Sequence, residues 1–155
     1  MCEHCGCRSV EPIAELMDEH DQFLGLARDI RHRLRDDDRA AVLALLTDLG
    51  RRLDAHVVVE ERGVFAALKD SGEYVEAVLD LERDHVGFDA QLHALDPRAT
   101  DFEHRVKQLL SELTLHIEKE NLGVFPVTLV TLSAAGWATV DRAHAERDEP
   151  APVPA

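Results

Sequence analysis

The sequence lacks any long hydrophobic run. No stretch of its 155 residues approaches the roughly 18 uninterrupted apolar residues of a membrane-spanning helix. The chain begins Met-Cys-Glu-His-Cys, without the basic start and apolar segment of a secretory signal. We therefore expect a cytoplasmic protein. This length suffices for one domain with a substantial core and is too short for two.

Basic residues are scarce relative to acidic ones. The chain has 17 Lys and Arg against 31 Asp and Glu, a formal net charge of −14. Binding to nucleic acid or to an anionic membrane depends on clustered Lys and Arg, so neither is an expected partner. An acidic surface favours cations, although it is also a common route to solubility.

Cysteine is absent from the body of the chain, because Cys2, Cys5 and Cys7 all fall in the first seven residues. They cannot cross-link the body, which must be held by packing or by metal. Together with His4 they form a Cys-x-x-Cys-x-Cys cluster that is too short to fold alone. This cluster could hold zinc, copper or iron, or exchange disulfides, and a reduced, flexible tail is the alternative.

Strand-like alternation is also rare, and apolar residues recur instead every three or four positions, which is the helical period. Short connections between long helices favour antiparallel neighbours, so the pattern predicts an all-α, up-down-up-down four-helix bundle. The predicted helices run from Pro12 to before Asp36, from Asp38 to Ser71-Gly72, from Glu73 to Asp96-Pro97, and from a Thr100–Glu103 capping box onward, with Pro126 expected to kink or end the last one.

The ends of the chain are expected to differ from the bundle. Residues 133–147, which include Trp137 and Val140, could form a short fifth helix lying on the bundle. The proline-rich residues 148–155 are predicted to be disordered. The expected organisation is an N-terminal stub over 1–9, a four-helix domain over 10–132, the short helix and the tail.

The chain contains an internal repeat. Residues 56–65 align without gaps on residues 116–125, and both segments read His-x-x-x-Glu followed by Gly-Val-Phe. A shorter match precedes each copy, since Glu19-His20 with Phe23 parallels Asp84-His85 with Phe88. The repeat predicts two helical hairpins related by an approximate two-fold axis.

Polar residues interrupt the apolar stripe of each predicted helix near its middle. Burying an ionised carboxylate without a partner costs several kcal/mol, and a pair of divalent cations would turn such groups into ligands. Residues four apart share one helix face, about 6 Å apart along the axis, so one helix can offer nitrogen and oxygen to one centre. Imidazole and carboxylate favour iron, then manganese or zinc. The alternative is that the polar residues of the stripes pair with one another in the core. The polar residues in question are His20, His56, Glu60, His85, His116 and Glu120.

This pattern resembles the hemerythrin family, and specifically the bacterial hemerythrin-like (HHE cation-binding) domains, over residues 10–132. The family pattern is His, His-x-x-x-Glu, His, His-x-x-x-Glu on four helices, and Gly-Val-Phe-Pro follows the last ligand here as in the family. The resemblance implies two non-haem iron ions, oxo- or hydroxo-bridged. Carried over by position, Glu60 and Glu120 bridge them, His20 and His56 bind one, and His85 and His116 bind the other.

One position departs from the family pattern. Oxygen-carrying members have a second histidine four residues after the third-helix ligand, where this chain has Asp89. The departure argues against reversible oxygen carriage. Asp89 could supply an extra carboxylate ligand or a hydrogen bond to an imidazole, or it could be a solvated carboxylate at the helix edge.

Several other residues are interpreted as structural. The four histidines off the stripes are expected on the surface. Glu61 and Glu118 are expected on solvated flanks of their helices, and a contact that supports a ligand is the less favoured alternative. Tyr74 and Trp137 are expected to pack against apolar neighbours. The off-stripe histidines are His32, His93, His104 and His144.

The expected function is binding of, or reaction with, O2, H2O2 or NO, in sensing or in the response to oxidative or nitrosative stress. Consumption of peroxide or NO would make the protein a weak redox enzyme. The resemblance also extends to di-iron proteins associated with repair of damaged iron centres, which implies, as an alternative, an iron store or donor with a protein acceptor. A third reading is a metal that only stabilises the fold. A monomer or weak dimer is expected.

Overall fold

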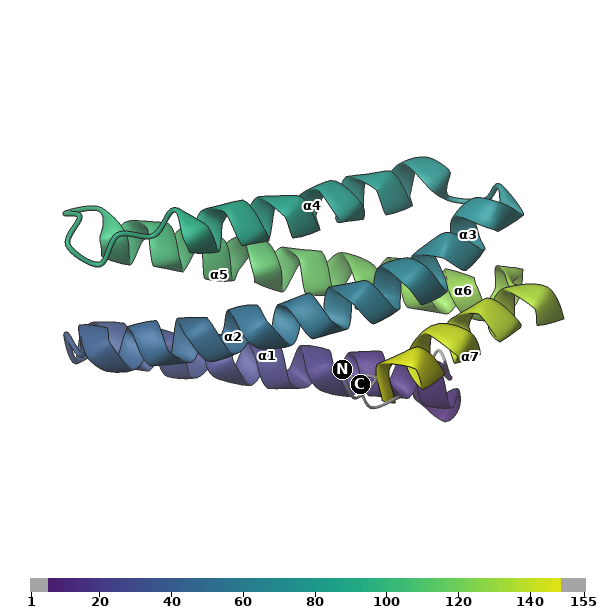
Figure 1. The fold of residues 1–155 in the computed structure, drawn as a ribbon, viewed down its shortest axis with the longest axis horizontal. Helices are drawn as coiled ribbons and strands as arrows, with labels where there is room; N and C mark the ends of the chain where they lie inside the picture. Colours follow the sequence, from purple (N-terminus) through teal and green to yellow (C-terminus); the bar gives the residue numbers. More distant parts are fainter. Residues whose placement is uncertain (1–5, 149–155) are drawn as a thin grey trace, which may run out of the picture.

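Four long helical segments run alternately up and down in the computed structural model, which describes residues 6–148, and one further helix crosses an end of the bundle (Figure 1). The predicted all-α bundle and its short C-terminal helix are confirmed. In chain order the elements are the 3-10 turn η1 (Cys7–Ser9), α1 (Glu11–Arg35), α2 (Arg39–Glu60), the π-helical turn η2 (Glu61–Phe65), α3 (Ala66–Ser71), α4 (Val75–His93), α5 (Phe102–Lys119), the π-helical turn η3 (Glu120–Val124), α6 (Phe125–Thr131) and α7 (Ala134–Asp148).

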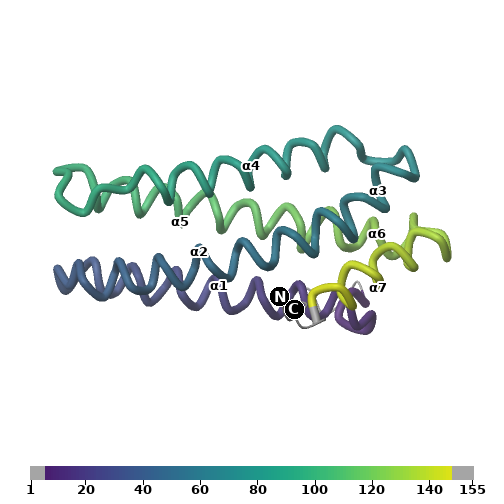
Figure 2. Tube along the Cα trace, viewed as in Figure 1, coloured from purple at the N-terminus to yellow at the C-terminus, as the bar shows by residue number. Residues whose placement is uncertain are grey.

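The bundle is built from two antiparallel hairpins. Helix α1 packs on α2 and α4 packs on α5, and the hairpins meet through α1 with α5 and α2 with α4. The connections within both hairpins lie at one end of the trace, and the connection from α3 to α4 lies at the other (Figure 2). Exchanging the hairpins therefore exchanges the α1–α5 face with the α2–α4 face. Within residues 6–148, no helix is both long enough and apolar enough to cross a membrane.

Most of the predicted helix ends are present. Pro12 lies in the first turn of α1, where its missing N–H leaves no bond unmade. The Asp38 carboxylate accepts a hydrogen bond from the Ala41 backbone N–H at 3.1 Å and caps α2. Gly72 adopts φ 77° and ends α3 in the left-handed conformation that glycine tolerates best.

The start of α5 and the end of α4 differ from the prediction. Asp101 precedes the first residue of α5 and no side chain caps the helix, so the Thr100–Glu103 capping box is wrong. Glu103 pairs instead with Lys107 one turn later, an alternative partner for the same carboxylate. Helix α4 ends at His93, three residues before the predicted stop.

The π-helical turns interrupt the second and fourth long segments at equivalent places in the repeat. Turn η2 follows Glu60 directly and η3 begins at Glu120, so each π turn adjoins the glutamate of a His-x-x-x-Glu unit. The last long segment does not end at Pro126. The π turn comes before the proline, and α6 continues to Thr131 with Pro126 in its first turn.

Two apolar clusters fill the bundle and leave a polar layer between them. One cluster surrounds Met17, Phe65 and Phe125 at the α7 end, and the other surrounds Phe23 and Phe88 toward the hairpin connections. His20 lies between Met17 and Phe23 along α1, which places the predicted ligand layer at the junction of the clusters.

The described part of the N-terminal stub packs on the bundle. Cys7 is fully buried in the cluster at the α7 end, where a thiol behaves as a small apolar group. Arg8 pairs with Asp18 and Asp21 on α1. The other members of the predicted soft-metal cluster, Cys2, His4 and Cys5, lie outside the described residues, as do residues 149–155.

Helix α7 is bound to the first hairpin by charged and aromatic contacts. Trp137 packs against the neighbouring apolar cluster, as predicted. His144 is buried, with Nδ1 2.9 Å from Glu15 Oε2, so its predicted surface position is wrong. Tyr74 directly precedes α4, with a backbone φ of 58°, and its side chain is 50 % exposed. Its predicted packing role is therefore also wrong.

Glycine at position 63 lets α7 approach η2 closely. A Cβ at Gly63 would lie 3.2 Å from the Ala143 Cβ and 3.5 Å from the Val140 Cα, whereas a Cβ at the repeat-equivalent Gly123 would meet nothing within 4 Å. We expect Gly63→Leu to lower the free energy of unfolding by about 1–3 kcal/mol through overpacking. Gly123→Leu should leave it unchanged or raise it by up to about 1 kcal/mol, because glycine is a poor helix former. Denaturant unfolding measures both, and equal effects would contradict this account of α7 docking.

Candidate metal centre

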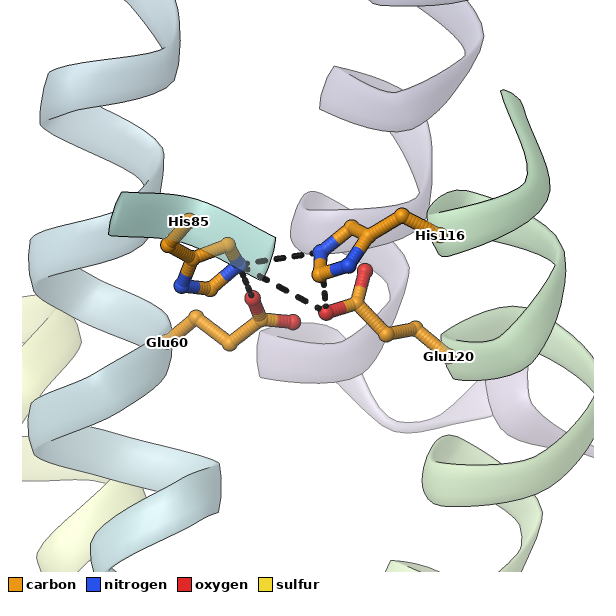
Figure 3. Close-up of side chains that lie close together, drawn as sticks. All are labelled: Glu60, His85, His116 and Glu120. Atoms are coloured by element: carbon orange, nitrogen blue, oxygen red, sulfur yellow. Dashed lines mark hydrogen bonds and ion pairs between the residues drawn. The ribbon is translucent and has the colours of Figure 1, made fainter. Parts of the chain in front are cut away.

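The structure brings all six predicted ligands together in the polar layer. Each side chain is buried, and both glutamates are 0 % exposed. Figure 3 shows four of them, Glu60, His85, His116 and Glu120, with their polar atoms turned toward one another. Nitrogen or oxygen atoms from these four lie within 4.8 Å of one another, and the same holds for the second group of His20, His56 and Glu60.

The imidazoles meet in pairs through their Nε2 atoms. The Nε2 atoms of His20 and His56 are 3.0 Å apart, and those of His85 and His116 are 2.9 Å apart. Two nitrogens bound to one ion at about 2.1 Å, about 90° apart, would be separated by about 3 Å. Each pair therefore has the spacing of two ligands on a shared cation.

A hydrogen-bond acceptor behind each ring fixes which nitrogen faces inward. His56 Nδ1 lies 2.6 Å from Glu19 Oε2, and His116 Nδ1 lies 3.2 Å from Asp84 Oδ2. Because these oxygens accept, the proton of a neutral ring is placed on Nδ1 and the Nε2 lone pair points into the layer.

The other two rings are held in the same way from the turns that follow the glutamates. His85 Nδ1 lies 2.8 Å from Glu61 Oε1, and His20 Nδ1 lies 2.9 Å from Asn121 Oδ1. Glu61 thus makes the supporting contact that was the less favoured alternative to a solvated flank, and the contact made by Asn121 was not predicted. The repeat carried the signal, because both residues directly follow the glutamate of a His-x-x-x-Glu unit.

The two central carboxylates each reach both hairpins. Glu120 Oε1 is 2.9 Å from His116 Nε2, and its Oε2 is 3.2 Å from His20 Nε2. Glu60 Oε2 is 3.5 Å from His85 Nε2 and 3.7 Å from His56 Nε2. With the ring protons on Nδ1, the four carboxylate oxygens are buried acceptors without a hydrogen bond. Such groups are costly unless a cation compensates them.

The protonation behaviour of the carboxylates reflects their crowding. Burial and the neighbouring charge of Glu120 raise the pKa of Glu60 well above its usual range. Burial also acts to raise the pKa of Glu120, but His116 and His20 outweigh it and lower that pKa well below its usual range. The two carboxylates cannot both ionise cheaply here without added positive charge.

Burial also favours neutral imidazoles in two of the four positions. It lowers the pKa of His56 and of His85 even though Glu19 and Glu61 act to raise them. Burial acts in the same direction on His116, but Glu120 and Asp84 outweigh it and raise that pKa. Neutral imidazoles and carboxylates are ligands suited to iron, manganese or zinc.

Four phenylalanines hold the rings in place. Phe125 stacks on His20 at 5.6 Å between ring centroids, and Phe65 stacks on His85 at 5.7 Å. Edge-on contacts at 5.1 and 5.2 Å join His56 to Phe23 and His116 to Phe88. These contacts explain why both copies of the repeat carry phenylalanine at the same places.

The remaining candidate residues lie on the surface. The Asp89 side chain is 61 % exposed, and its Oδ1 lies 3.1 Å from His93 Nδ1. In this structure Asp89 is therefore a solvated carboxylate at the helix edge. Glu118 is exposed, as predicted, and so are three of the off-stripe histidines, His32, His93 and His104.

One of three comparisons with known proteins found a match, and it includes the candidate metal centre. Searches of the curated proteins and of the solved structures found no match to the chain. A sequence model of the hemerythrin HHE cation binding domain matches residues 10–128, which include all six clustered residues. The chain therefore belongs to the hemerythrin HHE cation-binding domain family.

Proposed function

We propose that the chain is a non-haem di-iron protein that binds or reacts with a small ligand such as O2, H2O2 or NO, with His20, His56, Glu60, His85, His116 and Glu120 as the iron ligands. The observation that carries this proposal is the pairing of the four Nε2 atoms around two buried carboxylates, each of which reaches both pairs. Two separate imidazole pairs favour two ions over one.

The chain's own groups have distinct roles in this proposal. The acceptors on Nδ1 keep each ring oriented, and the two glutamates supply the negative charge that balances the ions. The apolar clusters on both sides of the layer limit water at the centre. When bound, a pair of irons supplies a change of oxidation state and open coordination positions for a small ligand.

The test is anaerobic purification followed by metal analysis and optical spectra. We expect two irons per chain and a spectral change after exposure to O2, H2O2 or NO. The alternative of an iron donor predicts instead that iron passes readily to an acceptor protein without a spectral response to these molecules. Fewer than two metal ions per chain after reconstitution would contradict the proposed centre.

A further inference from the structure

A surface hollow of about 260 Å³ between α2 and α4 leads to the polar layer. Its inner wall contains Leu53, Val57, His85 and Phe88. The same four side chains also line a small cavity of about 10 Å³ that touches all four ligand imidazoles. The hollow and the metal centre are therefore separated by a single layer of side chains, and the predicted ligand His85 belongs to that layer.

The repeat-equivalent face, between α1 and α5, is more tightly packed. Ile117, Leu113 and Phe23 stand there in place of Val57, Leu53 and Phe88, and each of the three is 2 % exposed. Ile117 has one more methylene group than Val57, its equivalent on the other face, and Val57 is partly exposed. The internal two-fold relation is thus inexact here, and the α2–α4 face is the more open of the two.

The open face is also the acidic one. Asp54, Glu61 and Asp89 line the hollow, and no lysine or arginine does. On the α1–α5 face Thr114, Asn121 and Leu24 occupy the positions equivalent to these three residues. That face has one equivalent carboxylate, Asp21 in the place of Val86, and it is paired with Arg8. A hollow lined by one sign of charge concentrates counter-ions and repels anions.

Glu61 connects this rim to the centre. Its carboxylate is partly exposed in the hollow, and its Oε1 is 2.8 Å from His85 Nδ1. His85 Nε2 lies in turn 3.5 Å from Glu60 Oε2. Ligand atoms for a cation thus extend without a break from solvent to the buried carboxylates.

We propose that the α2–α4 hollow is the port through which divalent iron enters and leaves the centre. Asp54 and Asp89 draw the hydrated cation to the opening, and Glu61 and His85 receive it at the inner wall. This inference rests on the proposed di-iron function and adds the route and the sign of charge that the route selects.

The first test removes charge from the opening without changing side-chain size. Ferrous iron is added anaerobically to the metal-depleted full chain, and the iron that is still unbound is measured in samples taken at short intervals with a chelator that colours on binding ferrous iron. We expect the double variant Asp54→Asn/Asp89→Asn to load about 3–10-fold more slowly than Asp29→Asn/Glu118→Gln at low ionic strength. The control loses the same charge from exposed positions that do not line the hollow. The difference should fade in about 0.5 M salt. Equal loading rates at low ionic strength would overturn the port.

The second test narrows the opening. Val57→Phe should slow both iron loading and chelator-driven release at least about threefold, whereas Leu115→Phe, on the exposed side of α5, should change neither. Both variants should bind the wild-type number of ions. Unchanged rates in Val57→Phe with two ions bound would disprove the port alone, while fewer than two ions in the wild type would disprove the proposed function itself.

Discussion

We expect His56→Ala and Glu120→Ala each to leave fewer than two metal ions bound per chain. His56 supplies one Nε2 of a pair that is 3.0 Å apart, and Glu120 is the carboxylate with an oxygen near an imidazole of each hairpin. Removing a group behind a ligand commonly costs 10–100-fold in metal affinity, so loss of the ligand itself should cost at least about 100-fold at one position.

Metal analysis after reconstitution measures this effect, and circular dichroism checks that the variants remain folded. Glu118→Ala is the matched control for Glu120→Ala, because Glu118 is exposed on the same helix and lies two residues away. It should bind the wild-type number of ions. Full occupancy in both ligand variants would show that these side chains are not ligands.

Glu60→Leu should make the metal-free protein more stable and should prevent the proposed two-metal centre from forming. Glu60 is fully buried and its oxygens accept no hydrogen bond. In the metal-free protein, burying this side chain therefore costs free energy that burying an apolar side chain of similar size would not cost. We expect the free energy of unfolding in the presence of chelator to rise by about 1–3 kcal/mol. With iron present the order should reverse, because bound metal stabilises only the native wild type.

The advantage of leucine should depend on pH. Because the folded-state pKa of Glu60 is raised, the folded metal-free chain holds this proton more tightly than the unfolded chain does. That contribution to stability is lost as the pH rises from the ordinary value of 4.5 through the raised pKa, so the gain from Glu60→Leu grows over that window. Denaturant unfolding with chelator at several pH values measures it. Glu118→Leu, on the exposed face, should stay within about 0.5 kcal/mol of wild type. A less stable Glu60→Leu in chelator would contradict the account.

The bundle and the cluster of six could be predicted because both depend on local periodicity. Apolar residues every three or four positions indicate which side of a helix is buried, and histidine or glutamate within that stripe must then be buried too. The repeat added the relation between the hairpins, so the four histidines could be grouped before any contact was known.

Other features depend on tertiary contacts that leave little trace in one sequence. The π turns beside Glu60 and Glu120 differ from α-helix only in hydrogen-bond register, which composition does not reveal. His144 lies on a weakly patterned helix, and its burial follows from how α7 crosses the first hairpin to reach Glu15. Asn121 was missed because an amide has no charge to mark it.

That amide makes the two halves of the centre electrically unequal. The ring of His20 is backed by the neutral Asn121, whereas the equivalent ring of His85 is backed by the carboxylate of Glu61. The carboxylates behind the other two rings do not restore the balance, because each is paired with a cation, Glu19 with Arg147 and Asp84 with Lys119.

The side of His85 and His116 therefore has one more uncompensated negative charge than the side of His20 and His56. A nearby negative charge stabilises ferric iron relative to ferrous iron, because the ferric ion carries the larger positive charge. If the centre holds one ferric and one ferrous ion, the ferric ion would be favoured beside Glu61 and the ferrous ion beside Asn121. A duplicated scaffold would in this way give its two metals separate potentials.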